Sequence, residues 1–378
     1  MSDRVRVAVA GLGAVAQSVH LPLLARRWDL FDVAALYDLS QSLRDDLGDQ
    51  YGVPPAHRYA AVDEMVTSAD VDGVLLLTSG SHGAAALHAV RNDVAVFCEK
   101  PLAYTVSEAD RLADAEAERG RPSVLVAYMK EYDGAVARLR ERLADIGEVR
   151  AVEVRVLHPS SASQLAFANL RPVPVDVPPP VAEKVRSTED ELLDAVLGPK
   201  ASPRIRLLYW FVVLGSLVHD TSLLRDLFGG LTEIDDARAW PDDALPPSVE
   251  VSGTLPGGAR ARLAWHYLEH YPAYHETLSM HHATGSMRVT FGTPYVLNAP
   301  TELTVVEAVP GGDLRTTYRS RGESFENELV AFHAMVTEGV RPRAGVAEGR
   351  ADIVTSQRIM RMLADHEGVS LDGEAAGA

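Results

Sequence analysis

The sequence predicts an α/β protein that begins with a doubly wound parallel sheet and continues into an α+β domain with a large, mostly antiparallel open sheet. In the first part of the chain, short apolar runs alternate with amphipathic stretches of helical length, which is typical of βαβ units. Between residues 231 and 320, strand-like runs instead follow one another, joined by turns such as Pro256-Gly257-Gly258 that favour antiparallel pairing. We therefore expect two domains, at 1–125 and 126–378.

The N-terminal elements follow from apolar runs and from helix-capping residues. Continuous apolar runs are typical of strands buried on both faces of a sheet, and they predict strands at 5–10, 31–37, 71–77, 94–97 and 123–129. The stretches between them predict helices at 40–50, 83–91 and 106–119. Ser40 is suited to cap the first helix, Asn92 to follow the second in the left-handed conformation, and Gly120 to end the third.

The second domain contains a Pro-rich insertion at 159–203, which holds the run PVPVDVPPP and an acidic helix candidate at 182–197. Proline at this density blocks regular structure, so we expect a long excursion over the surface or over a cleft. The remaining elements are helices at 134–143 and 204–228, strands at 148–157, 249–255, 259–268, 276–283, 287–291, 302–309 and 314–319, and two closing helices at 324–338 and 347–366.

Composition argues against several classes of protein. The 378 residues include 36 Lys and Arg against 53 Asp and Glu, and the resulting net charge of −17 opposes binding to nucleic acid and to anionic membranes. Cys98 is the single cysteine, so we expect neither an intrachain disulfide nor a cysteine-based zinc cluster. No other metal site is expected. The longest apolar run, 207–218, is shorter than the roughly 20 residues that cross a bilayer. We expect a cytoplasmic protein.

The turn after the first predicted strand carries a dinucleotide-binding pattern. The sequence GLGAVA has the spacing GxGxxA and lies between a strand and a helix, as this pattern requires. Gly11 allows a tight turn, and Gly13 lets the backbone approach a pyrophosphate at the helix N-terminus, beside Ala14 and Val15. The alternative is a bare strand–helix turn in which the glycines serve geometry alone.

Asp38 ends the second predicted strand, where a carboxylate can accept hydrogen bonds from an adenosine ribose. The same charge repels a 2′-phosphate, and the next basic residue, Arg44, lies on the following helix. The sequence therefore favours NAD, with NADP as the second option. A helix-capping role for Asp38 is the alternative interpretation.

The triplet Glu99-Lys100-Pro101 follows the predicted strand 94–97. A lysine at the carboxyl end of a parallel strand faces the crevice in which α/β sheets bind ligands. A positively charged nicotinamide nearby favours the neutral amine, which suits proton exchange with a substrate hydroxyl. Taken alone, a surface lysine in a turn is the simpler interpretation.

These motifs together resemble the glucose–fructose oxidoreductase/inositol dehydrogenase/MocA family. The similarity is clearest in the glycine motif, in VDGVLLLTSGSHGAAALHAV and in CEKPLAYTVSEADRLADAEAERG, and it extends along the chain except for 159–203. It implies a Rossmann domain followed by a substrate and oligomerisation domain. It also implies NAD or NADP as cofactor, and a homodimer or homotetramer formed through the C-terminal sheet.

The resemblance implies roles for individual residues. Lys100 matches the family's catalytic lysine, and His219 matches its catalytic histidine on the helix 204–228. The Lys100–Pro101 peptide is expected to be cis, as in family members. Thr78 and His82 match the loop that lies along the dinucleotide.

Further candidates surround these residues. Glu99 stands with Lys100 at the cofactor side, and Lys130 falls where family members place a residue facing the substrate. His158, at the junction with the insertion, is a candidate for lining the same site. The chain departs from the family pattern at Gly215, four residues before His219, where an Asp is frequent. Asp220 is the nearest carboxylate that can replace it, although adjacent helical residues point in different directions.

The expected activity is that of an NAD(P)-dependent oxidoreductase. It would transfer a hydride between nicotinamide and a secondary alcohol or ketone of a sugar, cyclitol or related polyol. Two alternatives remain: a catalytically inactive sensor of NAD or another ligand with the same fold, and an enzyme that recycles bound NAD during an elimination or glycoside cleavage. The acidic balance of the chain favours a neutral or aminated polyol over a phosphorylated substrate.

Overall fold

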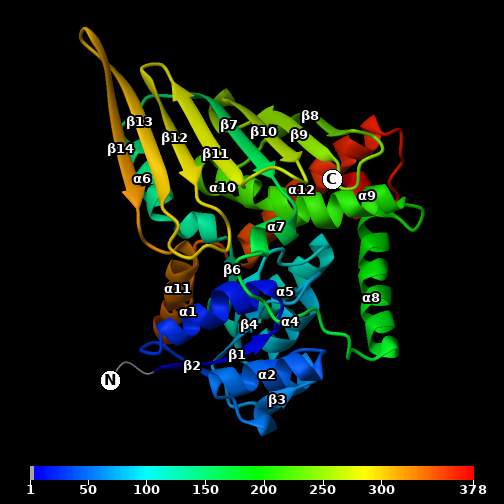
Figure 1. Ribbon diagram of the computed structural model, residues 1–378. Coiled ribbons are helices and arrows are strands. Elements are labelled where there is room, and N and C mark those ends of the chain that lie inside the picture. The colour runs from blue at the N-terminus through cyan, green and yellow to red at the C-terminus, as the bar shows by residue number, and fades with distance from the viewer. Residues whose placement is uncertain (1–3) are drawn as a thin grey trace. The chain divides into compact units, whose positions relative to one another are not determined.

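The computed structural model describes residues 4–378, which form two compact units (Figure 1). The first unit contains the chain up to Ala127 together with Ala168–Lys200 and Glu328–Val354, and the second contains Tyr128–Phe167, Ala201–Asn327 and Thr355–Ala378. The first change of unit falls close to the boundary predicted near residue 125. The sequence did not indicate that part of the insertion and part of the C-terminal helices return to the first unit.

A six-stranded parallel sheet forms the centre of the first unit, with the strand order β3-β2-β1-β4-β5-β6. Its strands are β1 Val5–Ala10, β2 Phe31–Tyr37, β3 Arg58–Tyr59, β4 Gly73–Leu76, β5 Ala95–Glu99 and β6 Val124–Ala127. The strand order reverses at β1, between β2 and β4, as in doubly wound dinucleotide-binding sheets. The predicted Rossmann-type fold is therefore confirmed, and a ligand crevice is expected at the carboxyl ends of β1 and β4.

Helices connect these strands: η1 Ala16–His20, α1 Leu21–Arg26, α2 Gln41–Tyr51, η2 Pro55–His57, α3 Val62–Ser68, α4 Gly83–Arg91 and α5 Val106–Arg119. The hydroxyl of Ser40 accepts a hydrogen bond from the Leu43 amide and caps α2, as predicted. Gly120 ends α5 with φ of +71°. The expectation for Asn92 is wrong, because its φ is −96° and Asp93 takes the left-handed conformation instead.

The insertion divides between the two units. A short helix, α7 Ser161–Leu165, belongs to the second unit, whereas helix α8 Pro179–Leu197 and the irregular segment 168–178 belong to the first. Helix α8 starts earlier than the sequence indicated. Proline is well tolerated in the first turn of a helix, where its missing N–H has no partner to lose, so Pro179 and Pro180 can open α8.

An eight-stranded sheet forms the centre of the second unit, with the order β14-β13-β12-β11-β7-β10-β9-β8 (Figure 1). Its strands are β7 Val149–His158, β8 Glu233–Trp240, β9 Ser248–Thr254, β10 Arg260–Tyr267, β11 His275–His282, β12 Gly285–Phe291, β13 Thr301–Val309 and β14 Gly312–Ser320. Every neighbouring pair is antiparallel except β7 and β10, which run parallel. The predicted large, mostly antiparallel sheet is confirmed.

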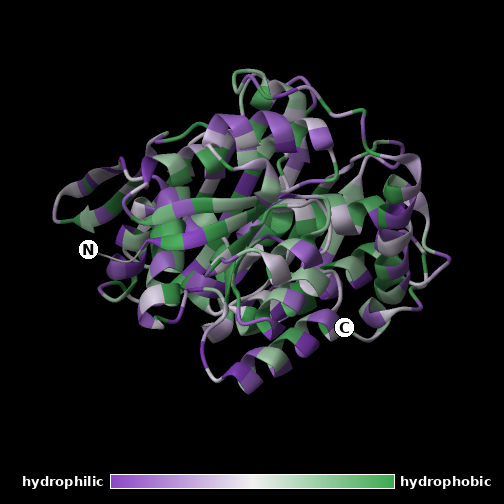
Figure 2. Cartoon of the chain, turned by 90° about the horizontal axis from the view of Figure 1, so that it is seen from below, coloured by the Kyte–Doolittle hydropathy of each residue, from purple (hydrophilic) through white to green (hydrophobic). Residues whose placement is uncertain are grey.

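The second unit also contains the helices η3 Met129–Tyr132, α6 Gly134–Leu143, α9 Pro203–Leu207, η4 Leu208–Leu217 and α10 Val218–Phe228. Of these, α6 packs on the sheet at β12, β13 and β14. The chain ends with α11 Ser324–Glu338, α12 Val346–His366 and η6 Glu374–Gly377, and η5 Pro256–Gly258 is a turn between strands. Helices α11 and α12 are each divided between the two units. The outer helices carry hydrophilic and hydrophobic residues side by side, as amphipathic helices do (Figure 2).

The continuous helical stretch Pro203–Phe228 is long and apolar enough to cross a membrane by length and composition alone. However, 67% of its most apolar window is buried inside the protein, which is typical of a core helix in a soluble domain. Its middle part, η4, is wound as a π-helix. Such segments are rare and are often found at functional sites.

Candidate functional site

The glycine motif forms a tight loop at the carboxyl end of β1. Gly11 has φ of +97°, and a Cβ atom placed on it would lie 2.7 Å from the backbone nitrogen of Thr78, so only glycine fits there. A Cβ on Gly13 would meet no atom within 4 Å, which leaves its backbone open on the side where a phosphate would approach. The residues present therefore fit a dinucleotide. The loop also places Thr78 directly beside the motif.

Asp38 ties the glycine loop to the start of α2. One carboxylate oxygen accepts a hydrogen bond from the Leu12 amide at 2.8 Å, and the other accepts one from the Ser40 amide at 2.9 Å. The carboxylate is half-buried at the end of β2, where an adenosine ribose would bind. Asp38 thus has the contacts of a turn-stabilising residue, and its contact with a ribose stays a prediction.

Lys100 follows β5 and begins a tight turn. The Lys100–Pro101 peptide is cis, as the family resemblance predicted. The Lys100 side chain is half-buried, whereas Glu99 before it is buried. Lysine is thereby held at the carboxyl edge of the parallel sheet, next to β4, where ligands of such sheets bind.

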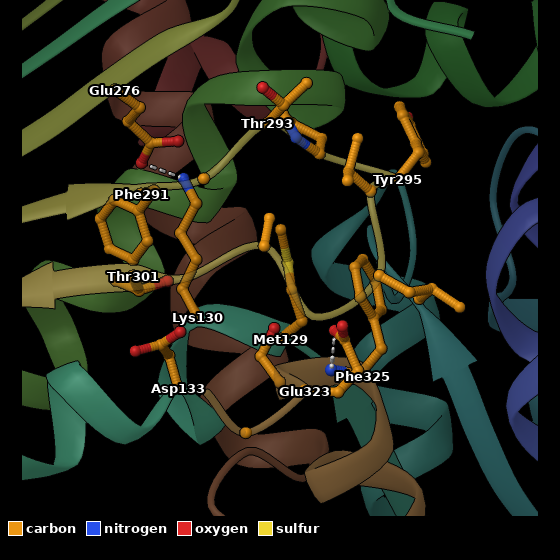
Figure 3. A pocket seen from close by; sticks show the side chains of 17 residues that line it. Met129, Lys130, Asp133, Glu276, Phe291, Thr293, Tyr295, Thr301, Glu323 and Phe325 are labelled. Carbon is orange, nitrogen blue, oxygen red and sulfur yellow. Dashed lines mark hydrogen bonds and ion pairs between the residues drawn. The ribbon is translucent and has the colours of Figure 1, made fainter. Parts of the chain in front are cut away.

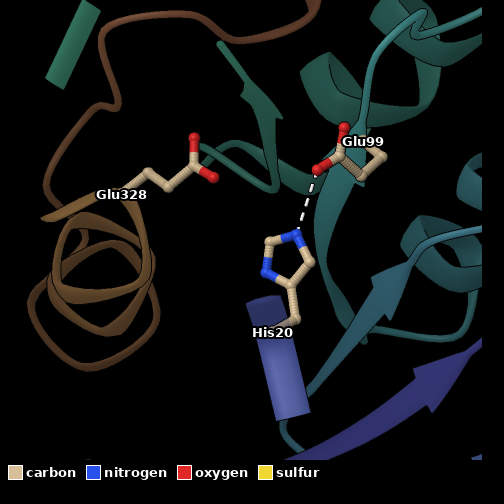
Figure 4. Close-up of side chains that lie close together, drawn as sticks. All are labelled: His20, Glu99 and Glu328. Atoms are coloured by element: carbon tan, nitrogen blue, oxygen red, sulfur yellow. Dashed lines mark hydrogen bonds and ion pairs between the residues drawn. The ribbon is translucent and has the colours of Figure 1, made fainter. Parts of the chain in front are cut away.

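Three buried side chains support this turn (Figure 4). His20 Nε2 lies 3.0 Å from a carboxylate oxygen of Glu99, and Glu328 from α11 completes the group. Burial acts to raise the pKa of Glu99, but the hydrogen bond and charge of His20 outweigh it, so the pKa is lowered. One donor atom of each residue lies within 4.8 Å of the others, a set that could hold a metal ion. We interpret it as support for the strand end that carries Lys100.

His82 is buried, and its ring spans the same turn. Nδ1 lies 2.8 Å from the Pro101 carbonyl oxygen, and Nε2 lies 2.8 Å from that of Thr78. Burial lowers the pKa of His82, and a neutral ring can donate to only one of these carbonyl groups. The side chain thus joins the loop after β4 to the cis turn after β5. Contact between His82 and a cofactor stays a prediction.

The second unit brings Lys130 and Asp220 together with a residue that the sequence did not single out, Glu276. The Lys130 ammonium lies 3.0 Å from an Asp220 carboxylate oxygen. It also pairs closely with Glu276, as Figure 3 shows. All three side chains are buried. Lys130 also lines a pocket in this unit with Glu276 and Phe291, and its ammonium is 5.3 Å from the centre of the Phe291 ring. Two carboxylates therefore share one buried cation.

This sharing shapes the titration of the group. Burial raises the pKa of Asp220 to about 7, against the charge of Lys130 and with the help of Glu276. Burial alone would lower the pKa of Lys130, but the charges of Asp220 and Glu276 outweigh it and raise it. Tyr274 donates a hydrogen bond of 2.5 Å to Glu276, and burial raises the pKa of its hydroxyl well above the usual value. The group can thus hold a proton on Asp220 near neutral pH.

The two predicted histidines have different surroundings in the second unit. His158 ends β7 and packs among aromatic rings, with centroid distances of 5.2 Å to Trp265 and 5.8 Å to Tyr274. It is therefore next to the Tyr274–Glu276 pair. His219 is half-buried on α10, directly before Asp220. Lys100 belongs to the first unit and His219 to the second.

Gly215, which replaces the Asp of the family pattern, lies in the π-helical segment. A Cβ on this residue would lie 3.1 Å from the Trp210 carbonyl oxygen. A larger residue would require a small shift of this turn, so glycine suits the helix geometry. Cys98 is buried, and burial raises the pKa of its thiol well above the usual value, in line with the expected unreactive role.

Comparisons with known proteins agree with the fold and the glycine loop. Residues 5–128 match the model of an oxidoreductase family with an NAD-binding Rossmann fold, the glucose–fructose oxidoreductase/inositol dehydrogenase/MocA family. An inositol 2-dehydrogenase from Burkholderia lata is 35% identical over 147 residues, which cover 39% of this chain and 43% of the relative. An inositol 2-dehydrogenase/D-chiro-inositol 3-dehydrogenase from Shouchella clausii is 34% identical over 157 residues, which cover 41% and 44%.

The chain thus spans less than half the length of the curated relatives that it matches. Over the whole chain, a scyllo-inositol dehydrogenase structure from Lactobacillus casei shares the fold, with a TM-score of 0.69, 15% identity and coverage of 97% of this chain and 98% of the other. Residues 5–128, almost all of them in the first unit, match an NAD-binding Rossmann fold. This match to the oxidoreductase family named above agrees with the sequence resemblance.

Proposed function

We propose that the protein is an NAD(P)-dependent oxidoreductase that transfers a hydride between nicotinamide and a secondary alcohol or ketone of a sugar, cyclitol or related polyol. The observation that carries this proposal is the glycine loop at the end of β1, with Lys100 on a cis turn at the end of β5. Bound nicotinamide would supply the hydride chemistry. The names of the relatives, inositol dehydrogenases, support a cyclitol as the substrate class.

Lys100 would bind the reacting oxygen of the substrate. Its ammonium can donate a hydrogen bond to a carbonyl or hydroxyl oxygen, and a proton leaves or returns at that oxygen as the carbon is oxidised or reduced. Glu99 and His20 hold the backbone from which Lys100 extends, so the side chain starts from a fixed point. Gly11, Gly13, Ala14, Val15, Asp38 and Thr78 would hold the dinucleotide.

Groups of the second unit would act on the substrate hydroxyls. His219 would exchange a proton, alone or with Lys100, and Lys130, Asp220 and His158 would bind hydroxyl groups. Lys130 and Glu276 line a pocket in this unit, where charged groups can donate to and accept from a polyol. The low density of positive charge overall supports a neutral or aminated polyol as substrate.

The test is a screen of the purified protein against inositols and neutral sugars, with NAD or NADP, in which reduced nicotinamide is followed by absorbance. Turnover that is lost in both Lys100→Met and His219→Ala supports the proposal. Binding of NAD without turnover on any substrate supports an inactive sensor instead. Substrate cleavage without net formation of reduced nicotinamide supports the redox-assisted elimination.

We also propose a cytoplasmic homodimer or homotetramer that assembles through the eight-stranded sheet. Along β7, buried Val152 and Val154 alternate with exposed Glu153 and Arg155, so one face of the sheet packs inward and the other is open in the single chain. We expect the same sheet face of a second copy of the chain to cover this open face. Light scattering that gives the mass of a monomer at micromolar concentration contradicts this part of the proposal.

A further inference from the structure

Part of the insertion lies against the start of α2, in the first unit. A carboxylate oxygen of Asp176 accepts a hydrogen bond of 2.8 Å from the Ser42 amide, and the same carboxylate is hydrogen-bonded to the hydroxyls of Ser40 and Ser42. Ser40 is the N-cap of α2, and Ser42 lies in its first turn. Asp176 thus accepts from one N–H group in the first turn of α2, at the end of the helix where an anion is stabilised.

The same segment is tied down at a second point. The Arg171 amide donates a hydrogen bond of 2.8 Å to the Gln17 side-chain oxygen, and the Gln17 amide group donates one of 2.8 Å to the Leu12 carbonyl in the glycine loop. The Arg171 guanidinium donates to Gln50 at 3.0 Å and lies 3.7 Å from Asp46, both on α2. We call residues 168–178 the strap. It runs from the glycine loop to the N-terminus of α2.

The anion position under Asp176 has a specific meaning in a dinucleotide-binding sheet. Asp38 lies at the end of β2, where a carboxylate binds the adenosine ribose in such folds. The extra phosphate of NADP extends from the 2′-oxygen of that ribose. Ser40 is the second residue after Asp38, and its amide already donates to the Asp38 carboxylate. A 2′-phosphate would therefore require hydrogen bonds from the Ser42 amide and from the Ser40 and Ser42 hydroxyls. In this structure these groups are hydrogen-bonded to Asp176.

We infer that Asp176 is a specificity-determining residue: its carboxylate fills the anion position at the N-terminus of α2 and excludes the 2′-phosphate, so that the protein selects NAD over NADP. This inference rests on the proposed function, since it requires that the first unit binds a dinucleotide. It adds a second carboxylate, supplied by the insertion, to the selection expected from Asp38 alone.

Two observations support a charged Asp176 at this position. The Ser42 amide and the Ser40 hydroxyl, which hydrogen-bond the carboxylate, lower its pKa below the usual value. The remaining groups around it would suit a phosphate once the carboxylate is removed. Ser40 and Ser42 carry hydroxyls, and the Arg44 guanidinium lies nearby, where it donates to the Asp38 carbonyl oxygen. Removal of one negative charge would convert this corner into a phosphate site.

The test compares binding of NAD, NADP and two fragments, ADP and adenosine 2′,5′-bisphosphate, by calorimetry. The variants are Asp176→Asn, Asp176→Ala and the control Glu191→Gln, which removes a negative charge from an exposed position of α8. Because a carboxylate repels a phosphate placed beside it, both Asp176 variants should lower the ratio of NAD to NADP affinity by about tenfold or more. The same change is expected in the ratio for the fragments, and none in Glu191→Gln.

An unchanged ratio in both Asp176 variants, with NAD still bound, overturns the inference and leaves the proposed function intact. An equal gain in affinity for NAD and NADP also overturns it, because the strap would then act as a cover without selecting between them. If the wild-type protein binds neither dinucleotide nor ADP, the proposed function fails first. Thermal unfolding of each variant checks that the fold is retained.

Discussion

The Lys130 ammonium lies 3.0 Å from the Asp220 carboxylate, although the two residues are 90 positions apart in the chain. Lys130 extends from the short helix after the parallel sheet, and Asp220 from the helix that carries His219. Glu276 closes the group from β11. One buried cation lies between two buried carboxylates, so the net charge of the group depends on how many protons it binds. This gives two of the predictions below.

Asp220 is expected to give the protein a titration near neutral pH. Burial raises its pKa from 3.8 to about 7, so the folded state binds a proton that the unfolded state releases. The associated stability is present at low pH and is lost as the pH rises through about 7. Denaturant unfolding at a series of pH values should show this fall in the wild type and not in Asp220→Asn. The same profile in both proteins would assign the titration to another group.

Lys130→Met is expected to lower the free energy of unfolding by about 3–5 kcal/mol, because it leaves two carboxylates buried without their cation. The double variant Lys130→Met/Glu276→Gln, which also removes one of the charges, should recover part of the loss. Lys184→Met is the matched control, since this lysine is exposed on α8. Chemical denaturation of all three proteins provides the comparison. Equal stability of Lys130→Met and Lys184→Met would show that the buried pair contributes little.

The elements that the sequence predicts best have local signals at both ends. Helix α5 has the predicted bounds because Thr105 and Glu108 form a capping box at its start and Gly120 ends it. Strand β8 was not singled out, because half of its sequence EIDDARAW is charged, as an edge strand of an open sheet can be. Local pattern therefore identifies elements, but it reveals an edge strand only weakly.

The candidate site shows the same limit. Gly11, Asp38 and Lys100 were found from sequence because their spacing to predicted strands carries the information. Glu276 was missed because a carboxylate at the start of a strand gives no sign of burial, and its partner Lys130 is 146 positions away. The position of the strap depends on contacts between residues far apart in the chain, such as that of Asp176 with Ser42. A Pro-rich run has no periodic pattern from which such contacts could be predicted.

Lys100→Met is expected to lower kcat by about 10²–10⁴-fold, the range typical for loss of a general acid or base, while NAD affinity changes little. The substitution keeps the length and apolar stem of the side chain and leaves the cis turn and the Glu99 contacts in place. Steady-state kinetics on the best polyol substrate, with calorimetry for NAD, separate the two effects. Lys200→Met, at an exposed position, is the control. Turnover of Lys100→Met at the wild-type rate would remove Lys100 from the proposed chemistry.

Gly11 and Gly13 should respond to alanine in different ways, because one glycine is required by the fold and the other only by a ligand. In Gly11→Ala the new Cβ meets the Thr78 nitrogen at 2.7 Å in a residue with φ of +97°, so the free energy of unfolding should fall by about 1–3 kcal/mol. In Gly13→Ala the Cβ meets no protein atom within 4 Å, so stability should be retained.

The same Gly13→Ala variant should bind NAD at least about tenfold more weakly, equivalent to 1.4 kcal/mol, because the methyl group occupies the space through which the pyrophosphate approaches the backbone. Gly147→Ala, which also meets no atom within 4 Å, is the control for an added methyl group away from the loop. Thermal unfolding and NAD calorimetry on the three variants distinguish the roles. Wild-type NAD affinity in Gly13→Ala would mean that the phosphates do not approach this glycine, and the bare-turn interpretation of the motif would then be preferred.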